Sequence, residues 1–149
     1  MAYLIMARLG RLVTSLPMSL ITLYQSRLQC DGLVSFAFSQ SGQSHDLVVP
    51  TRFFRDGGAR TVALVNDMAS PLAAAAQWTF DLHAGVETSV AATKSYIAQL
   101  VAGARVVAAW QGDSALQRAL DGLPRRCNAQ PNSIGSARST RWRTLIDCW

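Results

Sequence analysis

Residues 33–44 read Leu-Val-Ser-Phe-Ala-Phe-Ser-Gln-Ser-Gly-Gln-Ser, and the fold class follows from them. The first half, Leu33–Phe38, is an apolar run of β-favouring residues, which is typical of a strand covered on both faces. The second half, Ser39–Ser44, is a polar loop that leads into a helix predicted from about Ser44 to Asp56, which Pro50 should shorten or kink. A buried strand, a tight loop and a helix in direct succession indicate a parallel α/β sheet.

Strands and helices continue to alternate on both sides of this stretch. Before it we expect a helix at Ala2–Leu9 ended by Gly10, a short strand at Leu12–Ser15 and a helix opened by Pro17 that runs to Tyr24. After it we expect strands at 61–65 and 78–82, a short helix at 72–76 capped by Ser70, a long, mostly buried helix from about Glu87 to Gln111, and a helix at 116–123. The sequence therefore predicts a doubly wound parallel sheet with helices on both faces, formed by residues 1–124.

Length and composition exclude several classes of protein. The chain has 149 residues, of which 50% are hydrophobic and 15% are charged, so it can bury one core and is not expected to be disordered throughout. Its apolar stretches are too short or too interrupted to span a bilayer, and Pro17 breaks the run near the start that resembles a secretion signal. Three cysteines without C-x-x-C spacing, Cys30, Cys127 and Cys148, indicate neither a disulfide framework nor a zinc site. We therefore expect a cytoplasmic protein without a metal or a cofactor.

The positive charge is concentrated in residues 125–149. These hold five arginines and one aspartate, a charge of +4, whereas residues 1–124 hold nine basic and eight acidic residues, a charge of +1. The tail has no hydrophobic period, and we interpret it as irregular and as the product of a shifted reading frame. The alternative is a patch for RNA or a membrane surface built on Arg125, Arg126, Arg138, Arg141 and Arg143. Because this charge lies in a segment without a predicted fold, we expect neither nucleic acid nor a membrane as a partner.

The loop Ser39–Ser44 has the residue types of a phosphate-binding site. Its serine hydroxyls can donate hydrogen bonds to a phosphate, the start of the following helix favours an anion, and Gly42 lets the backbone approach closely. The absence of a lysine separates it from the G-x-x-x-x-G-K-[ST] loop of nucleotide triphosphatases. A polar turn followed by a capping serine explains the same residues without a ligand.

A second polar segment, His83–Lys94, opens the predicted long helix. Glu87, Thr88, Thr93 and Lys94 could reach a ligand at the carboxyl ends of the strands, where open α/β sheets bind theirs. A helix-capping carboxylate and a solvated lysine are the alternative interpretation.

Four ordered segments resemble the sugar isomerase (SIS) domain family: Phe38–Leu47, Gly58–Asn66, Ser70–Ala75 and Ala84–Lys94. The relatives that they suggest are the isomerase half of glutamine-fructose-6-phosphate aminotransferase and the SIS-type glucosamine-6-phosphate deaminases. The resemblance extends over about residues 2–124 and implies a flavodoxin-like strand order. It also implies binding of a hexose or hexosamine 6-phosphate within amino sugar metabolism.

The resemblance assigns roles to individual residues. In that family the serine-rich loop binds the phosphate of a hexose 6-phosphate, and the loop before the long helix contributes to the sugar site. By resemblance, the phosphate is assigned to Ser39, Gln40, Ser41 and Ser44, and the sugar to Val90, Glu87 and Lys94. Ala92 stands where the family often has serine, so one hydroxyl contact to the sugar is expected to be absent.

The sequence also departs from the family pattern. Such proteins carry two SIS domains in tandem, with the catalytic glutamate, histidine and lysine in the second, and nothing after Pro124 resembles a second domain. The first strand and its phosphate turn have no counterpart before Ala2, so we expect a partial domain that is incomplete at its N-terminus. No catalytic residue is assigned in this chain, and His45 is expected to be a surface residue rather than a base.

Three hypotheses about function follow. The first is a phosphosugar-binding fragment of an aminosugar-phosphate isomerase, aminotransferase or deaminase. The second is a non-catalytic module that senses a sugar phosphate, as a homodimer that supplies the missing surfaces. The third is a nucleic-acid binder that acts through residues 125–149, for which salt-dependent binding would be required.

Overall fold

A computed structural model describes residues 1–87 and 92–123. This part of the chain has six helices and three strands and divides into two compact units. One unit, Thr14–Gln99, contains the whole sheet. The other combines Met1–Val13 with Leu100 and the described residues after it.

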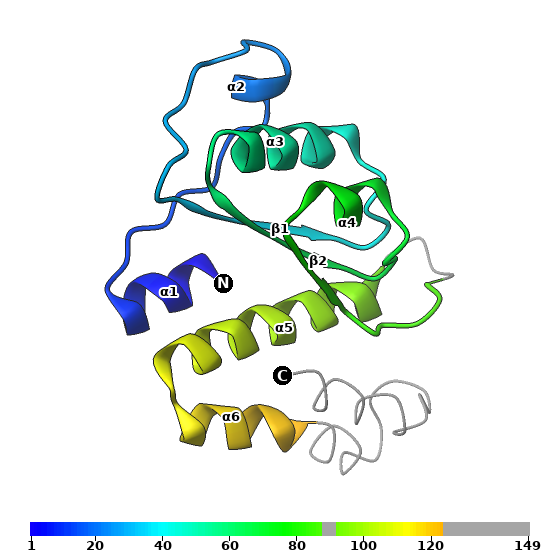
Figure 1. The fold of residues 1–149 in the computed structure, drawn as a ribbon. Coiled ribbons are helices and arrows are strands. Elements are labelled where there is room, and N and C mark those ends of the chain that lie inside the picture. The colour runs from blue at the N-terminus through cyan, green and yellow to red at the C-terminus, as the bar shows by residue number, and fades with distance from the viewer. Residues whose placement is uncertain (88–91, 124–149) are drawn as a thin grey trace. The chain divides into compact units, whose positions relative to one another are not determined.

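The sheet has three parallel strands in the order β1-β2-β3, which are Val34–Ser39, Arg60–Val65 and Trp78–Asp81. Three of the four predicted strands are confirmed, each within one residue of its predicted bounds. The strands run in the same direction, and Ser39 pairs with Val65, which pairs with Asp81. The carboxyl ends of the strands therefore lie side by side at one edge of the sheet (Figure 1).

Two helices cover one face of the sheet (Figure 1). The helix α3, His45–Asp56, packs against β1 and β2, and α4, Pro71–Ala75, packs against β2 and against α3. The apolar side chains between these elements form the core of this unit: Ala37, Val48, Ala63, Val65, Leu72 and Ala75. This arrangement confirms the predicted parallel α/β sheet.

The helix α3 continues past Pro50 to Asp56, so the prediction that this proline shortens the helix is wrong. Proline removes one backbone N–H from the helical hydrogen-bond pattern. The hydroxyl of Thr51 donates to the Leu47 carbonyl at 2.7 Å, and Pro50 and Thr51 are both buried. The Thr51 hydroxyl bonds the carbonyl of Leu47 and not that of Asp46, which the missing Pro50 N–H would have reached. Burial of Pro50 is therefore what offsets the lost backbone bond.

The predicted strand at Leu12–Ser15 is wrong, because these residues have no regular secondary structure and Leu12 is 99% exposed. A strand needs a neighbour that completes its hydrogen-bond ladder. The three strands of the described residues pair only with one another. After Pro17 the chain forms a single helical turn, α2, Ser19–Thr22, which is shorter than the helix expected to reach Tyr24.

The other unit contains α1, Ala2–Leu9, and α6, Ser114–Asp121, both within two residues of their predicted positions. Asp113 caps α6 by accepting hydrogen bonds from two N–H groups of its first turn, each at 2.9 Å. Its carboxylate also pairs with the guanidinium of Arg8. The N–H of Leu116 and the side chain of Arg8 hold the pKa of Asp113 below its ordinary value.

The long helix is α5, Thr93–Gln111, and it begins later than the predicted start at about Glu87. It was also expected to be mostly buried, whereas Ile97 and Leu100 are 41% and 52% exposed. No helix in the described part of the chain is both long enough and apolar enough to cross a bilayer. The predicted tail, 125–149, lies outside the described residues.

Candidate functional site

Three loops follow the strands at the carboxyl edge of the sheet (Figure 1): residues 40–44, 66–70 and 82–87. Open α/β sheets bind their ligands at this edge. The loop after β1 contains three of the four predicted phosphate residues and directly follows the fourth, Ser39, and the loop after β3 contains Glu87 of the predicted sugar site. The hydrogen bonds within these loops determine which side chains remain available to a ligand.

The loop after β1 is held against the start of α4. Gly42 has a left-handed φ of +64°, and its carbonyl accepts a hydrogen bond from the Leu72 N–H at 3.1 Å. A Cβ atom at position 42 would lie 2.1 Å from the Oγ of Ser70, so no side chain fits there. Ser70 is only 1% exposed, and its hydroxyl accepts from the Ala73 N–H at 3.3 Å. Glycine at position 42 is therefore required by both conformation and space.

The four residues predicted to bind phosphate lie on both sides of this glycine. Ser39, Gln40 and Ser41 precede it, and Ser44 follows it by two residues. The Oγ of Ser39 accepts from the Gly42 N–H at 2.9 Å, and the Oγ of Ser41 accepts from the N–H two residues on at 3.4 Å. A hydroxyl that accepts such a bond keeps its own proton to donate to a ligand. Ser41 and Ser44 are exposed, whereas Ser39 and Gln40 are half-buried. The exposed hydroxyls of this segment thus remain open to an anion.

The same segment forms the N-terminus of α3. Ser44 is the N-cap residue, and its hydroxyl makes no capping hydrogen bond. The N–H groups of a first helical turn have no acceptor within the helix, and they favour an anion. Asp46 lies in that turn and is exposed, so its charge opposes that of a phosphate. His45 is exposed, which agrees with its prediction as a surface residue.

The loop after β3 is held by side chains at two strand ends. Asn66, directly after β2, accepts from the Ala84 N–H and donates to the Gly85 carbonyl, both at 2.8 Å. Asp81, the last residue of β3, accepts from the His83 N–H at 2.7 Å and lies 3.0 Å from the His83 Nδ1. Sequence reasoning missed both Asn66 and Asp81. The available signal was a polar residue at the carboxyl end of a predicted strand.

The carboxylate of Glu87 caps α5 from outside the helix. Its side chain is 4% exposed and accepts from the Ser95 N–H at 3.2 Å and from the Ser95 hydroxyl at 3.4 Å. The Lys94 ammonium donates to the Val86 carbonyl at 2.8 Å and lies 4.0 Å from the Glu87 carboxylate. Glu87 is not itself helical, because α5 begins at Thr93 and Ala92 before it has no helical conformation. The structure gives Glu87 the capping role that was the alternative interpretation.

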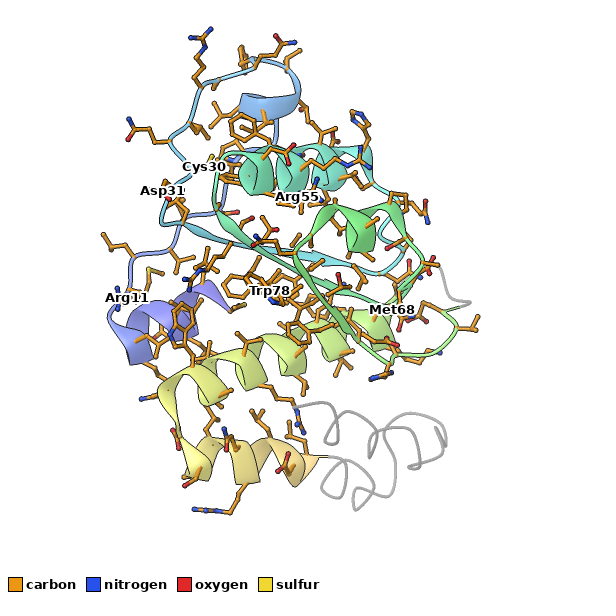
Figure 2. The ribbon with its side chains drawn as sticks, viewed as in Figure 1. Arg11, Cys30, Asp31, Arg55, Met68 and Trp78 are labelled. Atoms are coloured by element: carbon orange, nitrogen blue, oxygen red, sulfur yellow. The ribbon has the colours of Figure 1, made fainter. Side chains whose placement is uncertain are left out.

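The remaining residues considered in the sequence analysis add no further group to these three loops in the described part of the chain. Thr88 and Val90 are outside the described residues. Within residues 1–87 and 92–123, no three histidine, cysteine or acidic side chains are grouped so as to hold a metal ion. Cys30 is buried near the C-terminal end of α3, where a Cβ atom on Gly57 would lie 2.9 Å from its Cβ (Figure 2). Burial raises the pKa of the Cys30 thiol.

The part of the chain that forms these loops matches a known family. Residues 19–109 match the family described as SIS domain, and this range includes all three strands. A relative from Sulfolobus acidocaldarius, named glutamine-fructose-6-phosphate aminotransferase (isomerizing), is 40% identical over 98 residues, which cover 66% of this chain and 16% of the relative. A relative of the same name from Thermotoga maritima is 40% identical over 70 residues, which cover 47% and 12%. The chain therefore spans a small part of the curated relatives that it matches.

Two solved structures share the architecture. A protein from Silicibacter pomeroyi DSS-3, assigned by its name to the phosphosugar isomerases, superposes with a TM-score of 0.81 and 45% identity over 83% of this chain and 38% of that protein. The C-terminal domain of glucosamine-fructose-6-phosphate aminotransferase from Francisella tularensis superposes with a TM-score of 0.71 and 25% identity, over 82% and 36%. These likenesses confirm the predicted fold.

Proposed function

Because the chain belongs to the sugar isomerase (SIS) domain family, we propose that it binds a sugar phosphate and that residues Ser39–Ser44 hold the phosphate group. One observation carries the proposal: exposed serine hydroxyls lie at the N-terminus of a 12-residue helix, on a loop whose backbone is fixed by Gly42. A fixed loop loses little conformational freedom when a ligand binds. Its donors are therefore available without a rearrangement of the backbone.

We propose that the phosphate is recognised by hydrogen bonds rather than by an ion pair within the loop. Residues 39–46 contain no lysine or arginine, so the donors are hydroxyls, an amide and backbone N–H groups. They are the hydroxyls of Ser39, Ser41 and Ser44, the Gln40 amide, and the N–H groups of His45 and Asp46, since the Leu47 N–H donates to the Ser44 carbonyl. Each hydrogen bond to a charged acceptor contributes about 1.5–3 kcal/mol. Several such bonds can hold a phosphate while leaving the rest of the sugar to a neighbouring loop.

We propose that the sugar lies toward the loop after β3. Val90 is assigned there by the resemblance alone. Glu87 acts by fixing the start of α5, and Lys94, whose ammonium is half-exposed beside it, is the cation of that segment. The ligand class is a hexose or hexosamine 6-phosphate, because the relatives are named for enzymes of fructose 6-phosphate.

Two roles of the intact protein are compatible with this binding site. The first is the phosphosugar-binding part of an isomerase, aminotransferase or deaminase. A sensing module without turnover is the second, and one observation favours it: in the loop after β3 the acid and base groups are engaged, His83 with Asp81 and Glu87 with Ser95. Incubation with glucosamine 6-phosphate, or with fructose 6-phosphate and an ammonium salt as the nitrogen donor, separates the two roles. The sugar products and the ammonia released or consumed are measured.

The binding proposal is tested by calorimetric titration of the full 149-residue chain. The ligands are fructose 6-phosphate and glucosamine 6-phosphate, and the unphosphorylated sugars are the controls. The variant is Ser44→Ala, whose hydroxyl makes no capping bond, and the matched control is Ser114→Ala, an exposed serine in the first turn of α6. Loss of one hydrogen bond to a charged acceptor should weaken binding about tenfold or more for Ser44→Ala.

The expected result is binding of the phosphorylated sugars only, weakened by Ser44→Ala and unchanged by Ser114→Ala. Equal binding of free and phosphorylated sugars would contradict a phosphate site. Unchanged affinity in Ser44→Ala would move the phosphate away from the N-terminus of α3.

A further inference from the structure

Asn66 contacts both loops of the proposed ligand site. Its backbone N–H donates to the Gln40 carbonyl at 3.3 Å, in the loop of the phosphate residues. Its side chain accepts from the Ala84 N–H and donates to the Gly85 carbonyl, both at 2.8 Å, in the loop that follows β3. One residue at the end of the central strand is therefore bonded to segments on both sides of it.

The chemistry of this contact requires an asparagine. The amide supplies one acceptor and one donor at the same time, and the backbone of the loop after β3 presents the complementary N–H and carbonyl. An aspartate at position 66 would keep the acceptor for Ala84 but would lose the donor for Gly85. The short side chain also limits the distance between the loop and the end of β2.

The loop that Asn66 holds has an unfavourable backbone conformation that needs support from other residues. His83 has a φ of +48°, a left-handed conformation that residues other than glycine adopt only at a cost, and Gly85 has a φ of +71°. Such a conformation persists where surrounding bonds maintain it. Here Asp81 bonds the backbone of His83, and Asn66 bonds the backbone of Ala84 and Gly85.

We infer that Asn66 is a positioning residue that sets residues 83–87, the sugar loop, at a fixed distance from residues 39–44, the phosphate loop. A ligand whose phosphate is bound by the phosphate loop then has its sugar within reach of the sugar loop. This inference rests on the proposed function, because it concerns how that same site recognises the sugar. The phosphate group alone needs only residues 39–46, whereas a whole sugar phosphate also needs the second loop. Removal of the Asn66 amide should therefore affect the two kinds of ligand differently.

The first measurement is hydrogen exchange on the full chain without ligand. In Asn66→Ala, the Ala84 amide loses its acceptor, so peptides that span residues 82–87 should exchange about tenfold faster. The matched control is Gln77→Ala, because the Gln77 amide accepts from the Thr61 N–H at 3.2 Å at the other end of β2. The control should leave exchange of residues 82–87 unchanged. Unchanged exchange in Asn66→Ala would overturn the inference.

The second measurement compares inorganic phosphate with fructose 6-phosphate by calorimetric titration. In Asn66→Ala the affinity for inorganic phosphate should stay within about twofold of the wild type, while that for fructose 6-phosphate should fall about tenfold or more. Asn66→Asp keeps the acceptor for the Ala84 N–H, so its affinity for fructose 6-phosphate should lie between those of the wild type and of Asn66→Ala. Gln77→Ala should bind both ligands as the wild type does.

The outcomes separate failure of this inference from failure of the proposed function. If the wild type binds fructose 6-phosphate and Asn66→Ala weakens both ligands equally, or neither, Asn66 does not position the sugar loop and the inference is overturned. If the wild type binds neither ligand, the proposed function has failed, and the inference falls with it whatever the exchange of residues 82–87. A selective loss for the sugar phosphate supports both.

Discussion

Replacing Gly42 by alanine should destabilise the folded protein by about 3 kcal/mol, which combines three separate effects. The left-handed φ of +64° costs an L-residue about 1 kcal/mol. The new Cβ would lie 2.1 Å from the Oγ of Ser70 and 2.5 Å from its Cβ, so one of the two segments must move. Overpacking of this kind costs about 1–3 kcal/mol.

Ser70 cannot move away from the new Cβ without a further loss of stability. Ser70 is 1% exposed, and its hydroxyl caps α4 by accepting from the Ala73 N–H. Displacing that hydroxyl removes an N-cap interaction worth about 0.5–2 kcal/mol. If the loop moves instead, the Gly42 carbonyl leaves the Leu72 N–H, which lies 3.1 Å away. Either movement disturbs the link between the phosphate loop and α4.

Urea denaturation followed by circular dichroism measures the change, with Gly10→Ala as the matched control. Gly10 has a φ of +61°, and a Cβ there would meet nothing within 4 Å, so this variant pays the conformational cost alone. We expect a loss of about 1 kcal/mol for Gly10→Ala and a clearly larger one for Gly42→Ala. In the Gly42→Ala background, Ser70→Gly should restore part of the stability, because it removes the atoms in conflict. Equal losses in the two alanine variants would refute the steric argument.

Two further predictions concern other contacts. The Leu116 N–H and the Arg8 guanidinium lower the pKa of Asp113, so its ionised form stabilises the folded state at pH above the ordinary value of about 3.9, and this contribution is lost as the pH falls through the lower folded pKa. The difference in urea midpoint between the wild type and Asp113→Asn should therefore shrink from pH 7 to pH 2.5, and a constant difference would contradict the linkage. Arg55, seen between α3 and α4 in Figure 2, donates to the Ala75 carbonyl at 3.0 Å. Arg55→Ala should therefore lower the free energy of unfolding by about 1 kcal/mol, measured by the same urea denaturation. An unchanged midpoint would mean that this hydrogen bond contributes nothing to stability.

The strands of the sheet were predictable because their signal is local. Leu33–Phe38 and residues 61–65 are short runs of mostly apolar, β-favouring residues bounded by polar or glycine residues. Burial on both faces, which the first run was expected to have, is found for most of β2 but not for β1, where only Ala37 is buried and Val34 is 43% exposed. The failure at Leu12–Ser15 has the opposite cause, since a short β-favouring run becomes a strand only beside a partner. The prediction at Pro50 also failed for a tertiary reason, because burial of this proline in the folded unit offsets its missing N–H.

The candidate site shows where sequence reasoning ends. The serines of residues 39–44 carry their chemistry in their own side chains and could be identified from the sequence. Glu87 could not be assigned, because a carboxylate inside the first turn of a helix and one that caps the helix from outside look alike in sequence. Asn66 was missed because its role depends on Gln40 and Gly85, which are far from it along the chain and are brought together only by the parallel strands.

The polar groups at the carboxyl edge of the sheet divide into two sets with different tasks. Ser70, Asn66 and Glu87 direct their side chains to backbone groups of the fold, and these contacts hold the loops. Ser41 and Ser44 have exposed hydroxyls that keep a proton to donate. A neutral loop without a cation can hold a phosphate only if its donors already point at one place, since ordering them on binding would cancel much of the energy of each hydrogen bond. The affinity of such a site therefore depends as much on the residues that fix its backbone as on those that touch the ligand.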